Sequence, residues 1–197
     1  MRNVNKLLPP MISAIFHPFL MAPATFAILL FGRSDFSSRN WLLFLLCFAA
    51  TDLFPFFYVY RMKRRGETAG MDIPEHKKRF HPLLFSVMVY GLAFLMLLLL
   101  RASPLVTILM FAYMFNTMIA ALISGRWKIS IHGMAAGGPT AALGYAISGN
   151  FYWMFLLLPL LLFSRVKLQA HTPMQVIAGF LLGFLLTIIQ FRVGFPL

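Results

Sequence analysis

Long apolar runs separated by short polar segments make up almost the whole chain. A helix needs roughly 20 predominantly apolar residues to cross the hydrocarbon core of a bilayer. This pattern predicts an all-α, polytopic integral membrane bundle of about six to seven transmembrane helices, folded as one domain over residues 1–197. The seven candidate segments are residues 11–32, 41–60, 82–100, 103–124, 131–148, 149–163 and 173–192.

The segment 131–148 differs from the others in composition. It is the least hydrophobic of them and is rich in Gly and Ala. Small side chains let two helices approach closely inside a membrane bundle. We therefore expect this segment to form a buried, central helix.

The composition and charge of the chain favour a membrane protein over one that binds nucleic acid. Hydrophobic residues make up 60% of the sequence and charged residues only 11%, with a formal net charge of +12. The basic residues lie in short segments between apolar runs, where they orient membrane helices and contact anionic lipid headgroups. We therefore expect membrane lipids as partners and no nucleic acid. The single cysteine, Cys47, lies in an apolar run and cannot form an intramolecular disulfide.

Seven spans would put the N-terminus and the polar segments 61–80, 125–130 and 164–172 on one side of the membrane. Thirteen of the 17 Lys and Arg residues then lie on that side, which the positive-inside rule makes cytoplasmic. The first apolar run continues to Phe31, so we interpret it as an uncleaved helix and not as a signal peptide. The sequence thus predicts an integral protein of a prokaryotic inner (plasma) membrane.

Three polar clusters fall on this same side, each at the start of an apolar segment. Polar groups at the edge of a membrane helix are costly to desolvate, so they are candidates for function. Arg presents a planar fork of donors suited to phosphate, and His carries protons or acts as a nucleophile near neutral pH. The clusters are Glu75–Pro82, Arg126–Gly133 and Ser164–Gln175.

The last cluster resembles a motif of the type 2 phosphatidic-acid phosphatase superfamily, Ser-Arg-x5-His-x3-Asp. Ser164, Arg165 and His171 stand at the matching positions, with Gln175 in place of the Asp. The stretch His-Thr-x-x-Gln-Val is also similar to the branch of the family that acts on polyprenyl diphosphates. The resemblance covers roughly residues 75–190, and it implies the helical bundle that the family shares with vanadium-dependent haloperoxidases.

The other two clusters resemble the family motifs less closely. Of Pro-Ser-Gly-His, the chain keeps Ser130 and His132, with isoleucines in place of Pro and Gly. Of Lys-x6-Arg-Pro, it keeps basic residues before a proline, with His81 where the Arg would be. The third motif therefore carries most of the resemblance.

The resemblance implies a lipid phosphatase or diphosphatase that needs no metal and no cofactor. Its substrate would be a lipid phosphate, such as an isoprenoid carrier diphosphate or a phosphatidate. His171 would attack phosphorus and form a phosphohistidine, His132 would protonate the leaving oxygen and activate water, and Gln175 would orient His171. The implied phosphate-binding residues are Arg165, Arg79, Lys78, Ser130, Gly133 and His81.

Alternatives remain open for these residues. Thr172, Pro173 and Gln175 also fit the start of a helix, with Thr172 as N-cap and Gln175 closing a capping box. The chain could also be a non-catalytic lipid-binding or lipid-transport protein that retains the phosphatase fold. The histidines lack the paired spacing typical of metal sites, so no metal ligand is predicted.

Two polar residues lie inside apolar segments, away from the three clusters. His17 lies about 10 Å and Asp52 about 12 Å from the cytoplasmic ends of their helices, at 1.5 Å per residue. Because an isolated charge inside a membrane is disfavoured, we predict that they form a hydrogen-bonded or ionic pair. Alternatively, His17 and Pro18 start a helix and Asp52 belongs to a polar pocket of its own.

Overall fold

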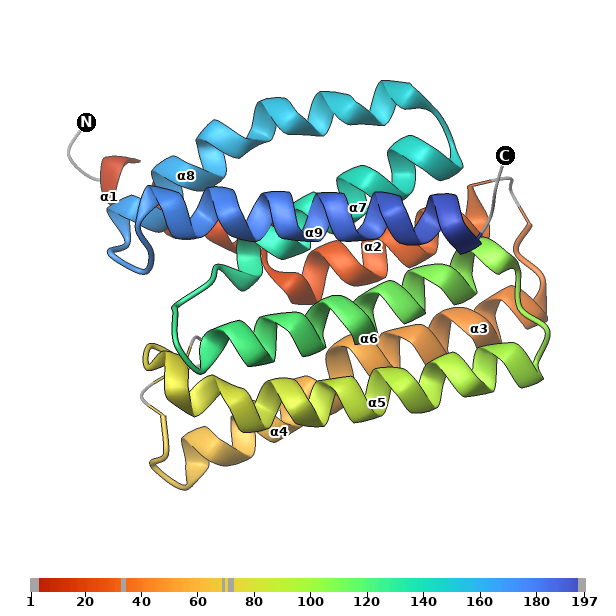
Figure 1. Ribbon diagram of the computed structural model, residues 1–197, viewed down its shortest axis with the longest axis horizontal. Helices are drawn as coiled ribbons and strands as arrows, with labels where there is room; N and C mark the ends of the chain where they lie inside the picture. Colours follow the sequence, from red (N-terminus) through yellow and green to blue (C-terminus); the bar gives the residue numbers. More distant parts are fainter. Residues whose placement is uncertain (1–3, 33–34, 69, 71–72, 195–197) are drawn as a thin grey trace.

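The computed structural model describes residues 4–32, 35–68, 70 and 73–194 (Figure 1). No β-strand occurs within these ranges, which confirms the predicted all-α class. The helices are α1 (Val4–Ile15), α2 (Pro18–Phe31), α3 (Ser38–Phe48), the π-helical turn η1 (Ala49–Leu53), α4 (Phe54–Arg64), the 3-10 helix η2 (His76–Arg79), α5 (Phe80–Leu99), α6 (Pro104–Ser124), α7 (Ile131–Ala146), the 3-10 helix η3 (Gly149–Leu157), α8 (Leu158–Lys167) and α9 (Pro173–Gly194).

Five helical stretches in the described part of the chain are long and apolar enough to cross a membrane. α3, η1 and α4 form one continuous stretch of 27 residues. η2 and α5 form a second stretch, and η3 and α8 form a third. α6 and α9 complete the five, and α1 with α2 makes a sixth if the pair counts as one span. These stretches confirm the predicted polytopic bundle.

The predicted segment 131–148 corresponds to α7, which has 16 residues. At 1.5 Å per residue it is about 24 Å long, shorter than the roughly 30 Å core of a bilayer. Most of its residues are buried, and it packs against α9, α2 and η3. The Gly- and Ala-rich helix is therefore central and buried, as expected, although it falls short of a full span.

The first predicted segment is divided by a bend of 43° between α1 and α2. Pro18 has no backbone N–H to continue the hydrogen bonds of α1, so a new helix begins there. His17 caps this new helix, because its Nδ1 accepts a hydrogen bond from the backbone N–H of Phe19 at 3.2 Å. His17 and Pro18 therefore start a helix, which is one of the two roles expected for them.

Glycines form the contact between α7 and α9: Gly133 and Gly137 on α7, and Gly179 and Gly183 on α9. Within each helix the two glycines are four residues apart and lie on one face. A Cβ atom at Gly133 would lie 2.6 Å from the carbonyl oxygen of Val176, so the two backbones touch directly. Glycine thus allows the close crossing that is common in membrane bundles.

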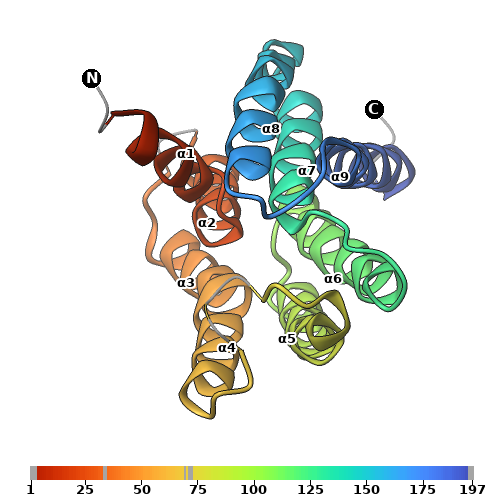
Figure 2. The ribbon, with the colours of Figure 1, turned by 90° about the vertical axis from the view of Figure 1, so that its left-hand side faces the viewer.

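The polar clusters predicted from the sequence meet at one end of the bundle. At the left of Figure 1, α4, α6 and α8 end and α5, α7 and α9 begin. Figure 2 looks onto this end. The starts of α7 and α9 are joined there by a hydrogen bond of 3.2 Å from the backbone N–H of Ser130 to the carbonyl oxygen of Gln175. Motifs that are tens of residues apart in the sequence therefore lie next to one another.

Replacing Gly137 by Ala should destabilise the bundle, whereas replacing the adjacent Gly138 should not. A Cβ atom at Gly137 would overlap the carbonyl oxygen of Phe180, and this clash can be relieved only by separating α7 from α9. At Gly138 the nearest atom is Oγ1 of Thr187, at an ordinary 3.5 Å. We expect Gly137→Ala to lose roughly 1–3 kcal/mol of stability, the usual cost of overpacking. Thermal unfolding in detergent micelles measures it, and equal midpoints for the two variants would contradict the glycine contact.

Candidate functional site

A cavity of about 140 Å³ lies at the end of the bundle where the predicted motifs meet. Among the described residues, three histidines and two arginines line it, together with apolar side chains from α2, α4 and α5. The three predicted motifs supply four of these five residues, and the bend between α1 and α2 supplies the other. The five residues are His17, Arg79, His132, Arg165 and His171.

His171 lies in the turn between α8 and α9 and is 7% exposed. Its Nδ1 lies 3.1 Å from Oε1 of Gln175. The same Oε1 accepts a hydrogen bond from the backbone N–H of Thr172 at 3.1 Å, and the Thr172 hydroxyl accepts one from the backbone N–H of Gln175 at 3.4 Å. Gln175 therefore closes the capping box of α9 and is also the partner of His171.

The capping box fixes the tautomer of His171. A backbone N–H can only donate, so the Gln175 atom that faces Thr172 is the oxygen, and this oxygen can only accept from His171. Nδ1 of His171 therefore carries the proton, and Nε2 keeps its lone pair. A neutral imidazole with an unprotonated nitrogen toward the substrate is the form that acts as a nucleophile.

Burial lowers the pKa of His171 to about 4, and the positive charge of Arg79 adds to this shift. The hydrogen bond to Gln175 acts in the opposite direction. It does not reverse the shift, because an amide carries no net charge and stabilises an imidazolium less than a carboxylate does. His171 is therefore neutral at pH 7 and stays so down to about pH 4.

Arg165 and His132 lie side by side, and both are buried. Nη1 of Arg165 donates a hydrogen bond to Oγ of Ser13 at 2.6 Å and lies 3.4 Å from Nε2 of His132. The Ser13 hydroxyl is itself 3.5 Å from that Nε2. A guanidinium from the last turn of α8 and an imidazole from the first turn of α7 thus face the same space.

Arg79 is held in place by backbone carbonyl groups from two segments. Its Nε donates a hydrogen bond to the carbonyl oxygen of Ile73 at 2.7 Å, and its Nη1 donates one to that of Ile129 at 3.2 Å. Ile129 occupies the first position of the second motif, so this contact joins the first cluster to the second. Arg79 thereby adds a second positive charge to the wall of the cavity.

Ser130 and Gly133, which the resemblance assigns to phosphate binding, interact with each other. Ser130 is the N-cap of α7, and its Oγ accepts a hydrogen bond from the backbone N–H of Gly133 at 3.1 Å. Ser130 is fully buried, and Gly133 belongs to the contact with α9. Neither residue is part of the lining of the cavity. Their observed contacts begin α7 and hold it beside α9.

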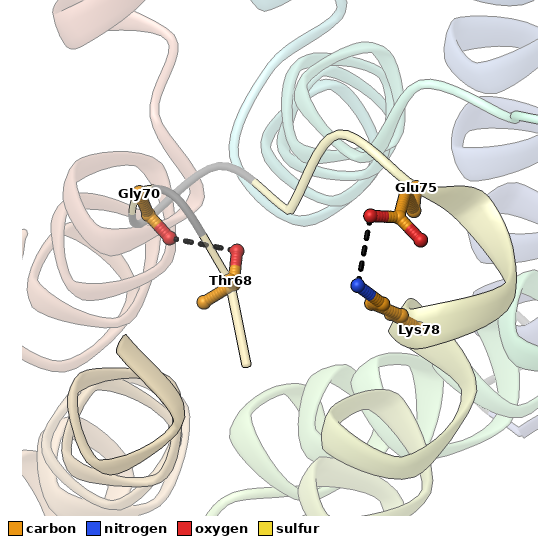
Figure 3. A network of polar contacts seen from close by, with 4 residues as sticks. All are labelled: Thr68, Gly70, Glu75 and Lys78. Carbon is orange, nitrogen blue, oxygen red and sulfur yellow. Dashed lines mark hydrogen bonds and ion pairs between the residues drawn. The ribbon is translucent and has the colours of Figure 1, made fainter. Parts of the chain in front are cut away.

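Lys78 and His81 lie outside the lining of the cavity. Nζ of Lys78 forms an exposed ion pair with Oε1 of Glu75 at 2.8 Å (Figure 3). His81 is exposed and has its ring edge-on to that of Phe80. Lys78 and Arg79 belong to the 3-10 helix η2, in which successive side chains point in different directions, whereas His81 lies in the first turn of α5. Of the basic residues of this cluster, Arg79 is the one that reaches the cavity.

The predicted pair of His17 and Asp52 stays a prediction. His17 lines the cavity, with its ring perpendicular to that of His132 and the ring centroids 5.0 Å apart. Asp52 is buried in η1, where its Oδ2 accepts a hydrogen bond from Oγ1 of Thr51 at 2.6 Å. Because Thr51 lines the same cavity as His17, Asp52 is joined to the wall of the site through its neighbour.

Sequence reasoning missed several polar residues of the site. Ser86 and Tyr90 line the cavity from α5, where they follow Pro82 at intervals of four residues. The helical period could have identified both, because such residues share one face of a helix. Ser13 gave no such signal. Its contact with Arg165 arises only because α1 packs against α8.

Comparisons with known proteins identify no relative. No protein-family model, no curated protein and no solved structure matches this chain. A proposed function therefore depends on the geometry of the cavity and on the motifs in the sequence.

Replacing Gln175 by Glu should raise the pKa of His171. The carboxylate would accept hydrogen bonds from both Thr172 and His171, and its charge would stabilise the imidazolium. The ring would then stay protonated to a higher pH than in the wild type, whose pKa is about 4. Histidine NMR titration in detergent micelles measures the shift, with Gln175→Leu as a control that removes the hydrogen bond and adds no charge. A pKa that does not rise in the Glu variant would contradict the observed arrangement.

Proposed function

We propose that this protein is an integral membrane lipid phosphatase or diphosphatase that acts through a phosphohistidine on His171. Its substrate is a phosphomonoester or diphosphate lipid, such as an isoprenoid carrier diphosphate or a phosphatidate-like lipid. The site faces the cytoplasm at a prokaryotic inner membrane, in keeping with the distribution of basic residues. One observation carries the proposal: two arginines and a neutral histidine of fixed tautomer line one cavity at the end of the bundle.

The size and charge of the cavity fit a phosphoryl group. Its volume of about 140 Å³ equals the space of roughly four to five water molecules in the liquid. Arg79 and Arg165 bring two planar guanidinium groups, which suit the oxygens of a phosphate. Positive groups that are already in place stabilise the charge on the equatorial oxygens during phosphoryl transfer. The starts of α7 and α9 lie at the same place, and a helix N-terminus favours an anion.

In the first step, Nε2 of His171 attacks phosphorus in line with the leaving oxygen. The N–P bond forms, the P–O bond breaks, and the leaving oxygen takes a proton from His132. Arg79 and Arg165 hold the other phosphoryl oxygens. The products are a phosphohistidine and a lipid alcohol, or a lipid monophosphate when the substrate is a diphosphate.

In the second step, water releases the phosphate. His132, now neutral, takes a proton from a water molecule, whose oxygen attacks phosphorus. The N–P bond breaks, inorganic phosphate leaves, and His171 regains the lone pair on Nε2. Gln175 accepts from Nδ1 of His171 throughout, so the ring keeps one tautomer between cycles.

A second, apolar cavity of about 90 Å³ adjoins the first and supports a lipid substrate. The two cavities share the lining residues Pro18, Leu83, Tyr90 and Ile131. The apolar cavity continues between α6, α7 and α9, away from the charged residues. A lipid with its phosphate between the arginines has the first carbons of its chain in this space.

A non-catalytic lipid-binding or lipid-transport protein is the second candidate. Two observations favour it. Gln175 stabilises a positively charged His171 less than a carboxylate would, and Lys78 and His81 lie outside the lining of the cavity. Both candidates bind a lipid phosphate, and only the phosphatase turns it over.

The purified protein should release inorganic phosphate from a polyprenyl diphosphate or a phosphatidate in mixed micelles that contain EDTA. His171→Ala should reduce this release by roughly 10³-fold or more, as loss of a nucleophile does. A colorimetric phosphate assay measures both. A wild-type protein that binds these lipids without releasing phosphate would refute the phosphatase and favour the second candidate.

Arg165→Gln should lower kcat/KM far more than Lys167→Gln, although both remove one positive charge. Arg165 is buried at the cavity, whereas Lys167 lies two residues further along and is exposed. Loss of a group that stabilises transition-state charge costs about 10²-fold or more, so we expect a drop of this order for Arg165→Gln and little change for Lys167→Gln. Equal drops in kcat/KM would mean that activity depends on the total charge at this end of the bundle and not on the position of Arg165 in the cavity.

A further inference from the structure

The bend between α1 and α2 reaches the cavity, although it lies outside the part of the chain that carries the phosphatase resemblance. α1 is fixed against α8 by a hydrogen bond of 2.6 Å from Oγ of Ser164 to the carbonyl oxygen of Pro9. Four residues on, Ser13 accepts the hydrogen bond from Arg165. Four residues further, His17 lines the cavity itself. Pro9 and Ser13 lie on one face of α1, which packs against α8. The bend after α1 then brings His17, the N-cap of α2, to the cavity.

The hydrogen bond that starts α2 fixes the tautomer of His17. The backbone N–H of Phe19 donates to Nδ1 at 3.2 Å, so Nδ1 carries no proton. The proton of the neutral ring is therefore on Nε2. The ring stands perpendicular to that of His132, with the centroids 5.0 Å apart. His17 thus brings a neutral N–H donor to the wall of a cavity that also contains two guanidinium groups.

We propose that His17 is a further substrate-contacting residue, whose Nε2–H donates a hydrogen bond to a phosphoryl oxygen. This inference rests on the proposed function, because it takes the cavity to be the phosphoryl site. The two histidines then have complementary tautomers. His171 directs a lone pair at phosphorus, whereas His17 directs a proton at oxygen and keeps that proton throughout the reaction.

The role of His17 as helix cap can be separated from its contact with substrate. Asn is among the best N-cap residues, so His17→Asn preserves the start of α2. Its shorter side chain does not reach the position of Nε2. His17→Ala removes both the cap and the donor. A purely structural role therefore predicts a defect in the Ala variant alone, and a substrate contact predicts a defect in both.

Thermal unfolding in detergent micelles, with and without inorganic phosphate, tests the contact without turnover. A ligand that binds only the folded protein raises the unfolding midpoint. We expect His17→Asn to keep the wild-type midpoint without phosphate and to bind phosphate about tenfold or more weakly, as for a lost hydrogen bond to a charged group. The value of kcat/KM for a lipid phosphate should fall by a similar factor.

Equal phosphate affinities of His17→Asn and the wild type would overturn the proposal, and a wild type that binds no phosphate would overturn it too. Failure of the proposed function has a different signature: the wild type binds phosphate, but no lipid phosphate is hydrolysed. NMR of wild-type protein with ¹⁵N-labelled histidine gives a second test that needs no variant. The Nε2–H signal of His17 should shift when phosphate is added, and an unchanged signal would refute the contact.

Discussion

The backbones of α7 and α9 touch at Gly133 and Gly179, because neither residue has a side chain. This contact brings the first turns of the two helices together, and the N–H of Ser130 can then bond to the carbonyl oxygen of Gln175. His132 lies in the first turn of α7, and His171 lies two residues before α9. A methyl group at either glycine would separate the starts of the two helices and so move His132 away from His171. The cavity therefore depends on a backbone contact between two helices whose glycines lie outside its lining.

Backbone groups near helix starts hold several polar side chains in or beside the cavity. Carbonyl oxygens hold Arg79, the N–H of Thr172 holds Gln175, and the N–H of Phe19 holds His17. The N–H groups are available because the first N–H groups of a helix have no partner within it. The carbonyl groups belong to Ile73 and Ile129, in the segments that precede η2 and α7. In this way neutral partners fix the tautomers of His17 and His171, and burial keeps His171 uncharged. An amide at position 175 suits such a site, since it orients the ring and adds no charge that would raise its pKa.

Much of the fold could be predicted from the sequence, because the information is local. The length of the apolar runs indicates helices that cross a membrane, and the Gly- and Ala-rich composition of α7 indicates a central helix. The start of α9 could be predicted from Thr172, Pro173 and Gln175 alone. Gln175 was expected to be a helix cap or a partner of His171, and the structure combines both roles, because one amide oxygen accepts from two donors.

The sequence by itself determined the all-α membrane bundle and the polar clusters that meet at one end of it, since hydropathy and residue spacing carry that information. Only the tertiary structure decided which polar residues of each cluster face the cavity. Lys78 and Arg79 are adjacent, and Arg79 turns inward because the carbonyl groups of Ile73 and of the distant Ile129 bind it. Ser13 and His132 are 119 positions apart, and Ser13 and Arg165 are 152 apart. Contacts over such distances follow from helix packing and leave no periodic pattern in the sequence.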